Sequence, residues 1–221
     1  MIVILATTAF AWTQQQTSSG IPVKWADTAI DFRMDFDSEP FAGASEVVRQ
    51  GFAEWEDISN DTIRFYGGRA TDRARDEKNG INEVGFLAEW DYSPTTLAVT
   101  RIWVNSIGEI EEFDLLLQAN PPNGWGEGTL QVDLLSTVRH EVGHALGLGH
   151  SDVREAVMYD SVKPGEHRIL HSDDIDAIRT IYLGDKEPDQ EETGCHHTEN
   201  FPFWWAAILA FRNKGVDNEV D

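Results

Sequence analysis

The chain has a single cysteine and few basic residues. Cys195 stands alone among 221 residues, which excludes an intramolecular disulfide framework. Lys and Arg total 17 against 39 Asp and Glu, a formal net charge of −22. So acidic a protein repels phosphates and anionic lipid head groups, so we expect neither nucleic acid nor an anionic membrane as a partner. No apolar run approaches the roughly 20 residues that a transmembrane helix needs, so no membrane span is expected.

The rest of the composition is that of a globular protein. Hydrophobic residues make up 41% of the chain and include eight tryptophans, unlike the composition of a disordered chain. This length accommodates one domain of ordinary size with a sizeable core, plus tails. Histidine is absent before position 140, and three of the seven histidines then fall between positions 140 and 150.

That stretch, His-Glu-Val-Gly-His-Ala-Leu-Gly-Leu-Gly-His, carries a zinc-binding pattern. His140 and His144 are four residues apart, so on a helix both imidazoles project from one face. Gly147 can take the left-handed conformation that ends a helix, after which the chain can return His150 as a third nitrogen ligand. Three ligands leave the fourth tetrahedral position of a zinc ion open, as in catalytic sites. Glu141 is placed to reach a zinc-bound water without being a ligand itself.

An alternative is a helix whose histidines are ordinary surface or core residues. Two histidines at this spacing with no further signal would often be interpreted in that way. Here the glutamate, the glycine and the third histidine all stand at the offsets that zinc chemistry requires, which disfavours it.

The sequence around this stretch resembles the metzincin zinc endopeptidases and, among them, the matrixins. Metzincins have a methionine-containing turn beneath the metal, and Ala156-Val157-Met158-Tyr159 is similar to it. Ser151 after the third histidine is typical of matrixins, and so is the segment 170–182 with its paired aspartates. Astacins and serralysins place a tyrosine two residues after the methionine, where this chain has Asp160. The resemblance covers roughly residues 23–184.

Two departures from the animal enzymes accompany the resemblance. With no histidine before His140, the second, structural zinc of animal matrixins has no imidazole ligands, so we expect one catalytic Zn²⁺ per chain. With Cys195 downstream of the domain, no upstream thiol provides a cysteine switch. In both features the chain resembles the secreted bacterial matrixins. Calcium is a further possibility through Asp72, Asp76 and Glu77, but their spacing is not that of an EF-hand and favours a solvated loop.

Composition divides the chain into four segments. Residues 1–11 are apolar and end in Ala-x-Ala, which resembles the end of a secretory signal peptide, with a buried N-terminal strand as the alternative. Residues 12–22 are expected to be a linker, polar over 13–20. Residues 23–184 form the expected catalytic domain. Residues 185–221 are expected to be an acidic linker and a tail with a short apolar block. The alternatives for the tail are a sorting signal, a segment that docks on the domain, and a disordered end.

Hydrophobic periodicity predicts the elements of the domain. Strands are expected over 30–36, 62–66, 97–104 and 110–118, and helices over 45–58 and from about 133 or 136. The segment 170–182 is similar to the C-terminal helix of matrixins. This order suggests an α+β fold with a twisted mixed sheet and the zinc-binding helix packed on one face. The resemblance to matrixins implies a sheet of five strands and a C-terminal helix. Ser45 is the expected N-cap of the first helix.

The resemblance implies a zinc-dependent endopeptidase, secreted or at the cell surface, monomeric, and acting on protein or peptide substrates. Glu141 would be the general base and acid, with zinc held by the three histidines. The resemblance also implies that 110–118 is the edge strand along the cleft, and that residues 159–164 form one wall of the specificity pocket. The alternatives are another zinc hydrolase, such as a serralysin-type peptidase, and a catalytically silent surface binding module. Glu141 has a purely chemical task, and its presence disfavours the silent module.

Overall fold

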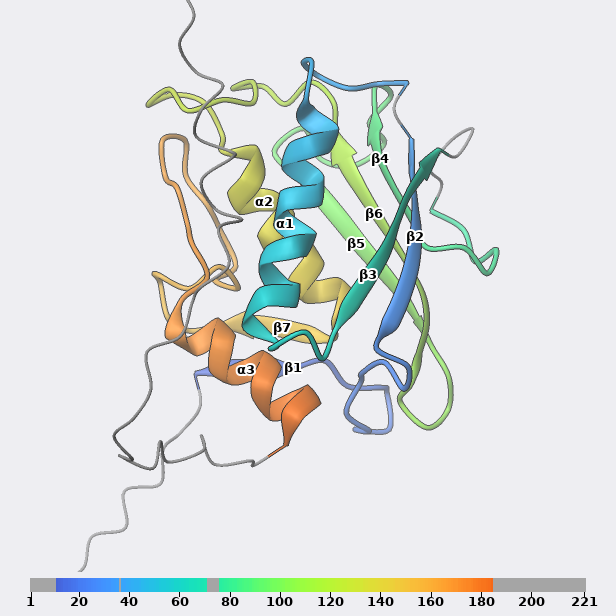
Figure 1. The fold of residues 1–221 in the computed structure, drawn as a ribbon. Helices are drawn as coiled ribbons and strands as arrows, with labels where there is room; N and C mark the ends of the chain where they lie inside the picture. The colour runs from blue at the N-terminus through green and yellow to red at the C-terminus, as the bar shows by residue number, and fades with distance from the viewer. Residues whose placement is uncertain (1–10, 36, 71–75, 185–221) are drawn as a thin grey trace, which may run out of the picture. The chain divides into compact units, whose positions relative to one another are not determined.

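The computed structural model describes residues 11–35, 37–70 and 76–184. The elements along the chain, drawn in Figure 1, are β1 (Trp12–Gln14), β2 (Ala29–Asp35), α1 (Ala44–Ile58), β3 (Arg64–Ala70), β4 (Glu83–Leu87), β5 (Ala98–Val104), β6 (Ile110–Gln118), α2 (Leu134–Ala145), β7 (Leu148–Ser151) and α3 (Ser172–Leu183). The expected segments 1–11 and 185–221 and residue Asp72 lie outside the described residues, apart from Ala11. No helix in the described ranges combines the length and the apolar character that crossing a membrane requires.

A five-stranded mixed sheet forms the frame of the domain, as expected. The strand order is β3-β2-β4-β6-β5, in which β5 alone runs antiparallel to its neighbour. The interior strand β6 is buried over most of its length, and Phe113, Leu115 and Leu117 are fully buried. Near-continuous apolar sequence of this kind is typical of strands that are covered on both sides.

The identity of the edge strand differs from our expectation. The segment 110–118 was expected at the edge of the cleft, but β6 pairs with β4 on one side and with β5 on the other. The edge strand is β5, whose residues are half-buried or exposed throughout. The reason is topological. The hairpin places β5 outside β6, and an apolar strand such as β6 gains most from the interior position.

Two helices lie side by side against one face of the sheet, as Figure 1 shows. Phe52 of α1 stacks on Phe32 of β2 with ring centroids 4.5 Å apart, and Trp55 of α1 donates its indole N–H to the carbonyl of Arg139 in α2. A Cβ at Gly51 would lie 2.5 Å from Val138 Cγ1, so the two helices approach too closely for any larger residue. Helix α2 is thereby fixed against both α1 and the sheet.

The starts of the two helices have different causes. The side chain of Asp133 caps α2 by accepting a hydrogen bond from the backbone N–H of Ser136, as one of the two predicted starts requires. Helix α1 begins two residues earlier than a Ser45 cap would allow. Its N-cap is Gly43, with φ 91° and no side-chain cap, so the prediction for Ser45 was wrong. The left-handed turn needed here suits glycine, whatever the capping ability of the neighbouring serine.

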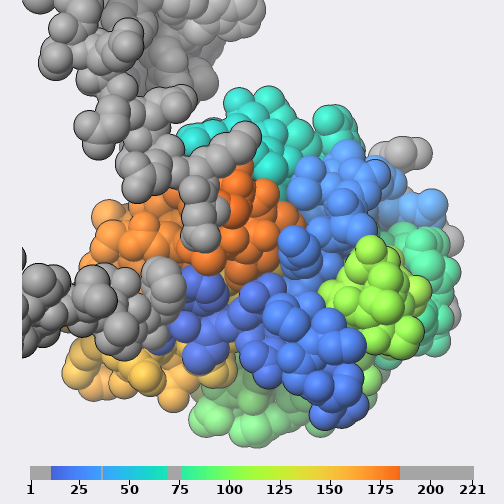
Figure 2. All heavy atoms as spheres, turned by 90° about the horizontal axis from the view of Figure 1, so that it is seen from below, coloured from blue at the N-terminus to red at the C-terminus, as the bar shows by residue number. Residues whose placement is uncertain are grey.

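The polar segment after residue 11, expected to be a linker, contains a short strand. Trp12–Gln14 form β1, which pairs antiparallel with β7. The backbone N–H of Gln15 donates to the carbonyl of Gly147, which extends this association, and the N–H of Val23 donates to the carbonyl of Gln15. The blue N-terminal residues accordingly lie against the orange α3 in Figure 2. Polar side chains did not indicate a strand here, because its partner lies far away in the sequence.

Strand β4 had no individual prediction, and the loop before it is held by buried carboxylates. Glu112 accepts hydrogen bonds from the backbone N–H groups of Asn79 and Gly80, and Asp114 accepts them from Glu77 and Glu83. Burial raises the pKa of Asp114 to about 8. Asp76, a candidate calcium ligand, instead pairs with Arg101 of β5 at 2.7 Å.

Candidate metal centre and cleft

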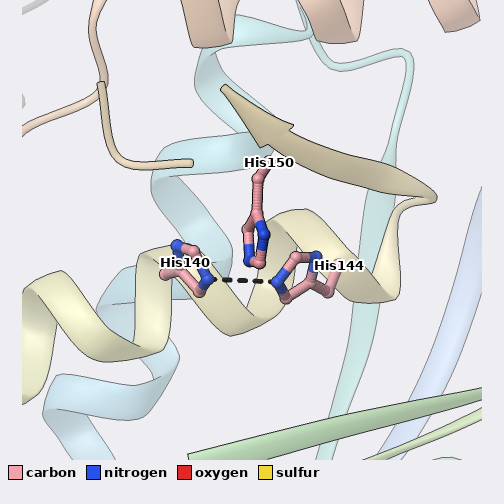
Figure 3. Close-up of side chains that lie close together, drawn as sticks. All are labelled: His140, His144 and His150. Carbon is pink, nitrogen blue, oxygen red and sulfur yellow. Dashed lines mark hydrogen bonds between the residues drawn. The ribbon is translucent and has the colours of Figure 1, made fainter. Parts of the chain in front are cut away.

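The end of α2 brings the three predicted histidines together. His140 and His144 project from one face of the helix, which ends at Ala145. Gly147 follows with φ 88°, and a Cβ there would lie 2.4 Å from the carbonyl oxygen of Val23, so only glycine fits this turn. Strand β7 then carries His150 back over the helix, and Figure 3 shows the three rings converging on one point.

Hydrogen bonds assign the tautomers of the two helical histidines. Nδ1 of His140 lies 2.8 Å from the carbonyl oxygen of Val157, and Nδ1 of His144 lies 2.9 Å from that of Leu148. A carbonyl only accepts, so each Nδ1 carries the proton and each Nε2 presents a lone pair. Such partners fix the ring orientation of metal-ligating histidines. Burial lowers the pKa of both groups to about 4, so both rings are neutral near pH 7.

The arrangement of these nitrogens fits a zinc ion. The Nε2 atoms of His140 and His144 are 3.0 Å apart, and the ligand atoms of all three histidines lie within 4.8 Å of one another. Two facing lone pairs at this distance repel each other unless a cation lies between them. Zinc–nitrogen bonds of about 2.0–2.1 Å in a tetrahedron place neighbouring nitrogens about 3.3 Å apart. Within the described ranges, no other group of three histidine, cysteine or carboxylate side chains meets in this way.

Glu141 lies beside the histidines and is almost completely buried, with 7% of its surface exposed. Its Oε2 accepts a hydrogen bond of 2.7 Å from the hydroxyl of Thr100 on β5. Burial raises the pKa of Glu141 above its ordinary value, against the opposing influence of His144 and Thr100. A carboxylate in this environment holds a proton more readily than one in water.

The turn that contains Met158 lies beneath the histidines. Asp174, fully buried on α3, accepts hydrogen bonds from the backbone N–H groups of Val157 and Met158 and so fixes the turn. A Cβ at Gly143 of α2 would lie 2.3 Å from the Met158 sulfur, so the methionine packs directly on the helix that carries the ligands. Asp173, the other member of the pair, accepts from the Ser151 hydroxyl at 2.6 Å.

A cleft of about 490 Å³ opens over the three histidines and Glu141. One side is formed by residues 95–100, at the start of edge strand β5, and the other by Tyr159, Asp160, Ser161 and Val162. The second set falls within the segment 159–164 that was predicted as a pocket wall. Both sides line the same cavity as the metal centre, so an elongated ligand in the cleft contacts the edge strand.

Two residues that contribute to the cleft were not anticipated. Thr100 binds Glu141, and Arg168 lies beneath the wall 159–162, where its guanidinium donates to the carbonyl of Ser161 at 2.6 Å and faces the Tyr159 ring. Neither has a motif of its own. The only available signal for Thr100 was its place in the predicted strand 97–104, the strand before the one that was expected along the cleft.

The other histidines have different environments. His171 is the N-cap of α3, and His167 lies 3.6 Å from Asp133. His196 and His197 lie outside the described residues. Nothing in the spacing of these four histidines predicted any of them as a ligand.

Comparison with known proteins assigns the chain to a family. The family model described as matrixin, a peptidase family, matches residues 7–183. Metalloendoproteinase 5-MMP of Arabidopsis thaliana is 32% identical over 158 residues, which are 69% of this chain and 40% of that protein. Matrix metalloproteinase-19 of Homo sapiens is 47% identical over 156 residues, 67% of this chain and 28% of that protein. Interstitial collagenase B of Mus musculus is 30% identical over 197 residues, 87% of this chain and 41% of that protein.

The chain spans less than half the length of these plant and mammalian relatives, and they give no support for the expected bacterial type. The family match covers most of the chain and includes the sheet, the three histidines and the methionine turn. The mixed five-stranded sheet with its helices is that of a matrixin catalytic domain, whose activity depends on zinc. The chain is a member of the matrixin family of metallopeptidases.

Proposed function

We propose that the chain is a zinc-dependent endopeptidase in which His140, His144 and His150 hold the ion and Glu141 moves the proton. The observation that carries the proposal is the convergence of three imidazoles beside a buried glutamate in an open cleft. Zinc bound there supplies a Lewis acid that polarises the scissile carbonyl and lowers the pKa of water. Glu141 accepts a proton from the attacking water and returns it to the departing amine.

The edge strand supplies the proposed docking site for the substrate. Within the described residues, β5 pairs with β6 alone, so one side of its backbone is open where residues 97–100 line the cleft. An extended peptide can add to such an edge through main-chain hydrogen bonds, which give affinity with little sequence preference. A main-chain mode of binding also accounts for cleavage within a chain rather than at its ends.

Side-chain selectivity is proposed to come from the wall 159–162. Val157 and Val162 contribute apolar surface to the same cleft. We expect cleavage on the amino side of Leu, Ile, Met or Phe, because an apolar side chain gains free energy by leaving water in such a pocket. Sequencing the products of a denatured protein mixture measures this preference, and cuts mainly before charged or small residues contradict it.

The test of the catalytic assignment uses Glu141→Gln and, as a matched control, the exposed Glu155→Gln. Each protein is assayed with an internally quenched peptide and analysed for zinc. Glu141→Gln should lower kcat/KM at least about 10³-fold while keeping its zinc, because the carboxylate moves a proton and is not a ligand. The control should match the parent. Activity of Glu141→Gln within tenfold of the parent refutes the assigned role. A parent that binds zinc and cleaves nothing would instead favour a silent binding module.

A further inference from the structure

Thr100 connects the edge strand to the proposed catalytic glutamate. Its hydroxyl lies 2.7 Å from Glu141 Oε2 and 3.1 Å from the backbone oxygen of the same residue. A hydroxyl has one proton to donate. The shorter contact is to the carboxylate, and a bond to a charged acceptor is the stronger one, so the proton is directed to Oε2.

This contact holds one carboxylate oxygen and leaves the other available. No side chain of the described residues donates a hydrogen bond to Oε1 of Glu141, although the backbone N–H of Thr100 also favours the charged form of the carboxylate. A glutamate has several rotatable bonds, and fixing them costs free energy that the fold can provide in advance. Fixing Oε2 on β5 leaves Oε1 as the oxygen that faces the reacting water.

The position of Thr100 also matters for the substrate. It lies on the strand whose open backbone is the proposed docking site, among the residues that line the cleft. Because the Glu141 carboxylate is bound to Thr100, a movement of β5 relative to α2 displaces this carboxylate together with the docked peptide. The effect of small misplacements on catalytic rate is large, because reacting atoms must lie within about 3–3.5 Å in a narrow range of directions.

We propose that Thr100 is a positioning residue that sets the orientation of the Glu141 carboxylate relative to a peptide docked on β5. The inference rests on the proposed endopeptidase function and deepens it. Thr100 transfers no proton and binds no metal; it acts through Glu141.

Two substitutions separate the hydroxyl from the shape of the side chain. Thr100→Val keeps the branched shape and removes the donor, whereas Thr100→Ser keeps the donor and removes a methyl group. Thr180→Val on α3 is the matched control, since it removes a threonine hydroxyl that donates to a backbone carbonyl, that of Asp176, outside the cleft. All are compared as zinc-loaded full chains.

Thr100→Val should lower kcat about 10- to 100-fold with KM within about twofold of the parent, because orientation affects the reaction step more than peptide binding. Thr100→Ser should stay within about threefold of the parent in both constants, and Thr180→Val should match it. A rise in KM at unchanged kcat, or a loss in Thr100→Ser as large as in Thr100→Val, overturns the proposal.

Crystal structures of the parent and the two Thr100 variants give a readout that needs no substrate. The Glu141 carboxylate should have one orientation in the parent and in Thr100→Ser, and more than one in Thr100→Val. A single unchanged orientation in Thr100→Val overturns the proposal. If the parent cleaves no peptide, the proposed function fails, while loss of the single orientation in Thr100→Val still supports the positioning role.

Discussion

Gly143→Ala is a sharp test of the packing beneath the metal centre. In an exposed helix, replacing glycine by alanine gains about 0.8–1 kcal/mol. Here the new Cβ would lie 2.3 Å from the Met158 sulfur and 3.1 Å from Trp55 Cζ2, whereas ordinary contacts lie at about 3.5–4.0 Å. Both neighbours are buried, and overpacking of a core costs about 1–3 kcal/mol. The clash should outweigh the helix propensity and leave a net loss of up to about 2 kcal/mol.

A double-mutant cycle with Met158→Ala identifies the cause of that loss. Met158→Ala alone should cost about 2–5 kcal/mol, as large-to-small changes in a core do. Met158→Ala removes the sulfur, and with it the closest contact of the new Cβ, and leaves the milder Trp55 contact at 3.1 Å. In that background Gly143→Ala should therefore cost less than about 0.5 kcal/mol or even stabilise the fold. The coupling between the two sites should exceed about 1 kcal/mol.

Urea unfolding at saturating zinc provides the assay, because bound metal adds its own stabilisation and must be held constant. The single variant Gly143→Ala should also unfold about 2–8 °C below the parent, since 1 kcal/mol corresponds to about 2–4 °C in a domain of this size. If Gly143→Ala stabilises the parent, or costs the same in both backgrounds, the packing argument is refuted.

Three other predictions concern stability and metal content. Asp174→Ala leaves two buried N–H donors and one partly buried donor without their acceptor, and should cost about 3–6 kcal/mol in urea unfolding. The exposed Asp176→Ala on the same helix should cost less than about 0.5 kcal/mol, and equal losses would contradict this. Because burial raises the pKa of Asp114 from 3.8 to about 8, its protonation stabilises the fold. The free energy of unfolding should therefore fall between about pH 4 and pH 8 relative to Asp114→Asn, and a difference independent of pH would refute that role. A chelator should lower Tm and one equivalent of zinc should restore it, with elemental analysis finding one zinc per chain; two equivalents would show a second site that the sequence did not indicate.

The local parts of the metal centre could be predicted because their determinants lie close together in the sequence. The spacing of His140 and His144 fixes their common face once a helix forms. The left-handed turn at Gly147 and the cap at Asp133 also depend on a few neighbouring residues. The histidine convergence therefore follows from the periodicity of one helix and the stereochemistry of one turn.

The remaining features depend on partners that are distant in the sequence. Strand β1 exists because β7 accepts it, and Thr13 bonds to the carbonyl of His150 from 137 positions away. Strand β4 has five residues and is recognisable only between β2 and β6. The position of β5 at the edge is a property of the whole sheet. Thr100 is 41 positions from Glu141, so only the fold brings them together.

An open edge strand also has a consequence for how copies of this protein behave toward one another. Edge strands pair readily with any extended chain, and proteins protect them with charges and bulges. The exposed Arg101 and the irregular register between Trp103 and Val104 protect the C-terminal half of β5 from pairing with another chain. Residues 95–100, at and before its start, carry no charge. The net charge of −22 makes copies repel each other at a distance. Salt near 1 M shortens the range of that repulsion to about 3 Å, so self-association through β5 should increase with ionic strength.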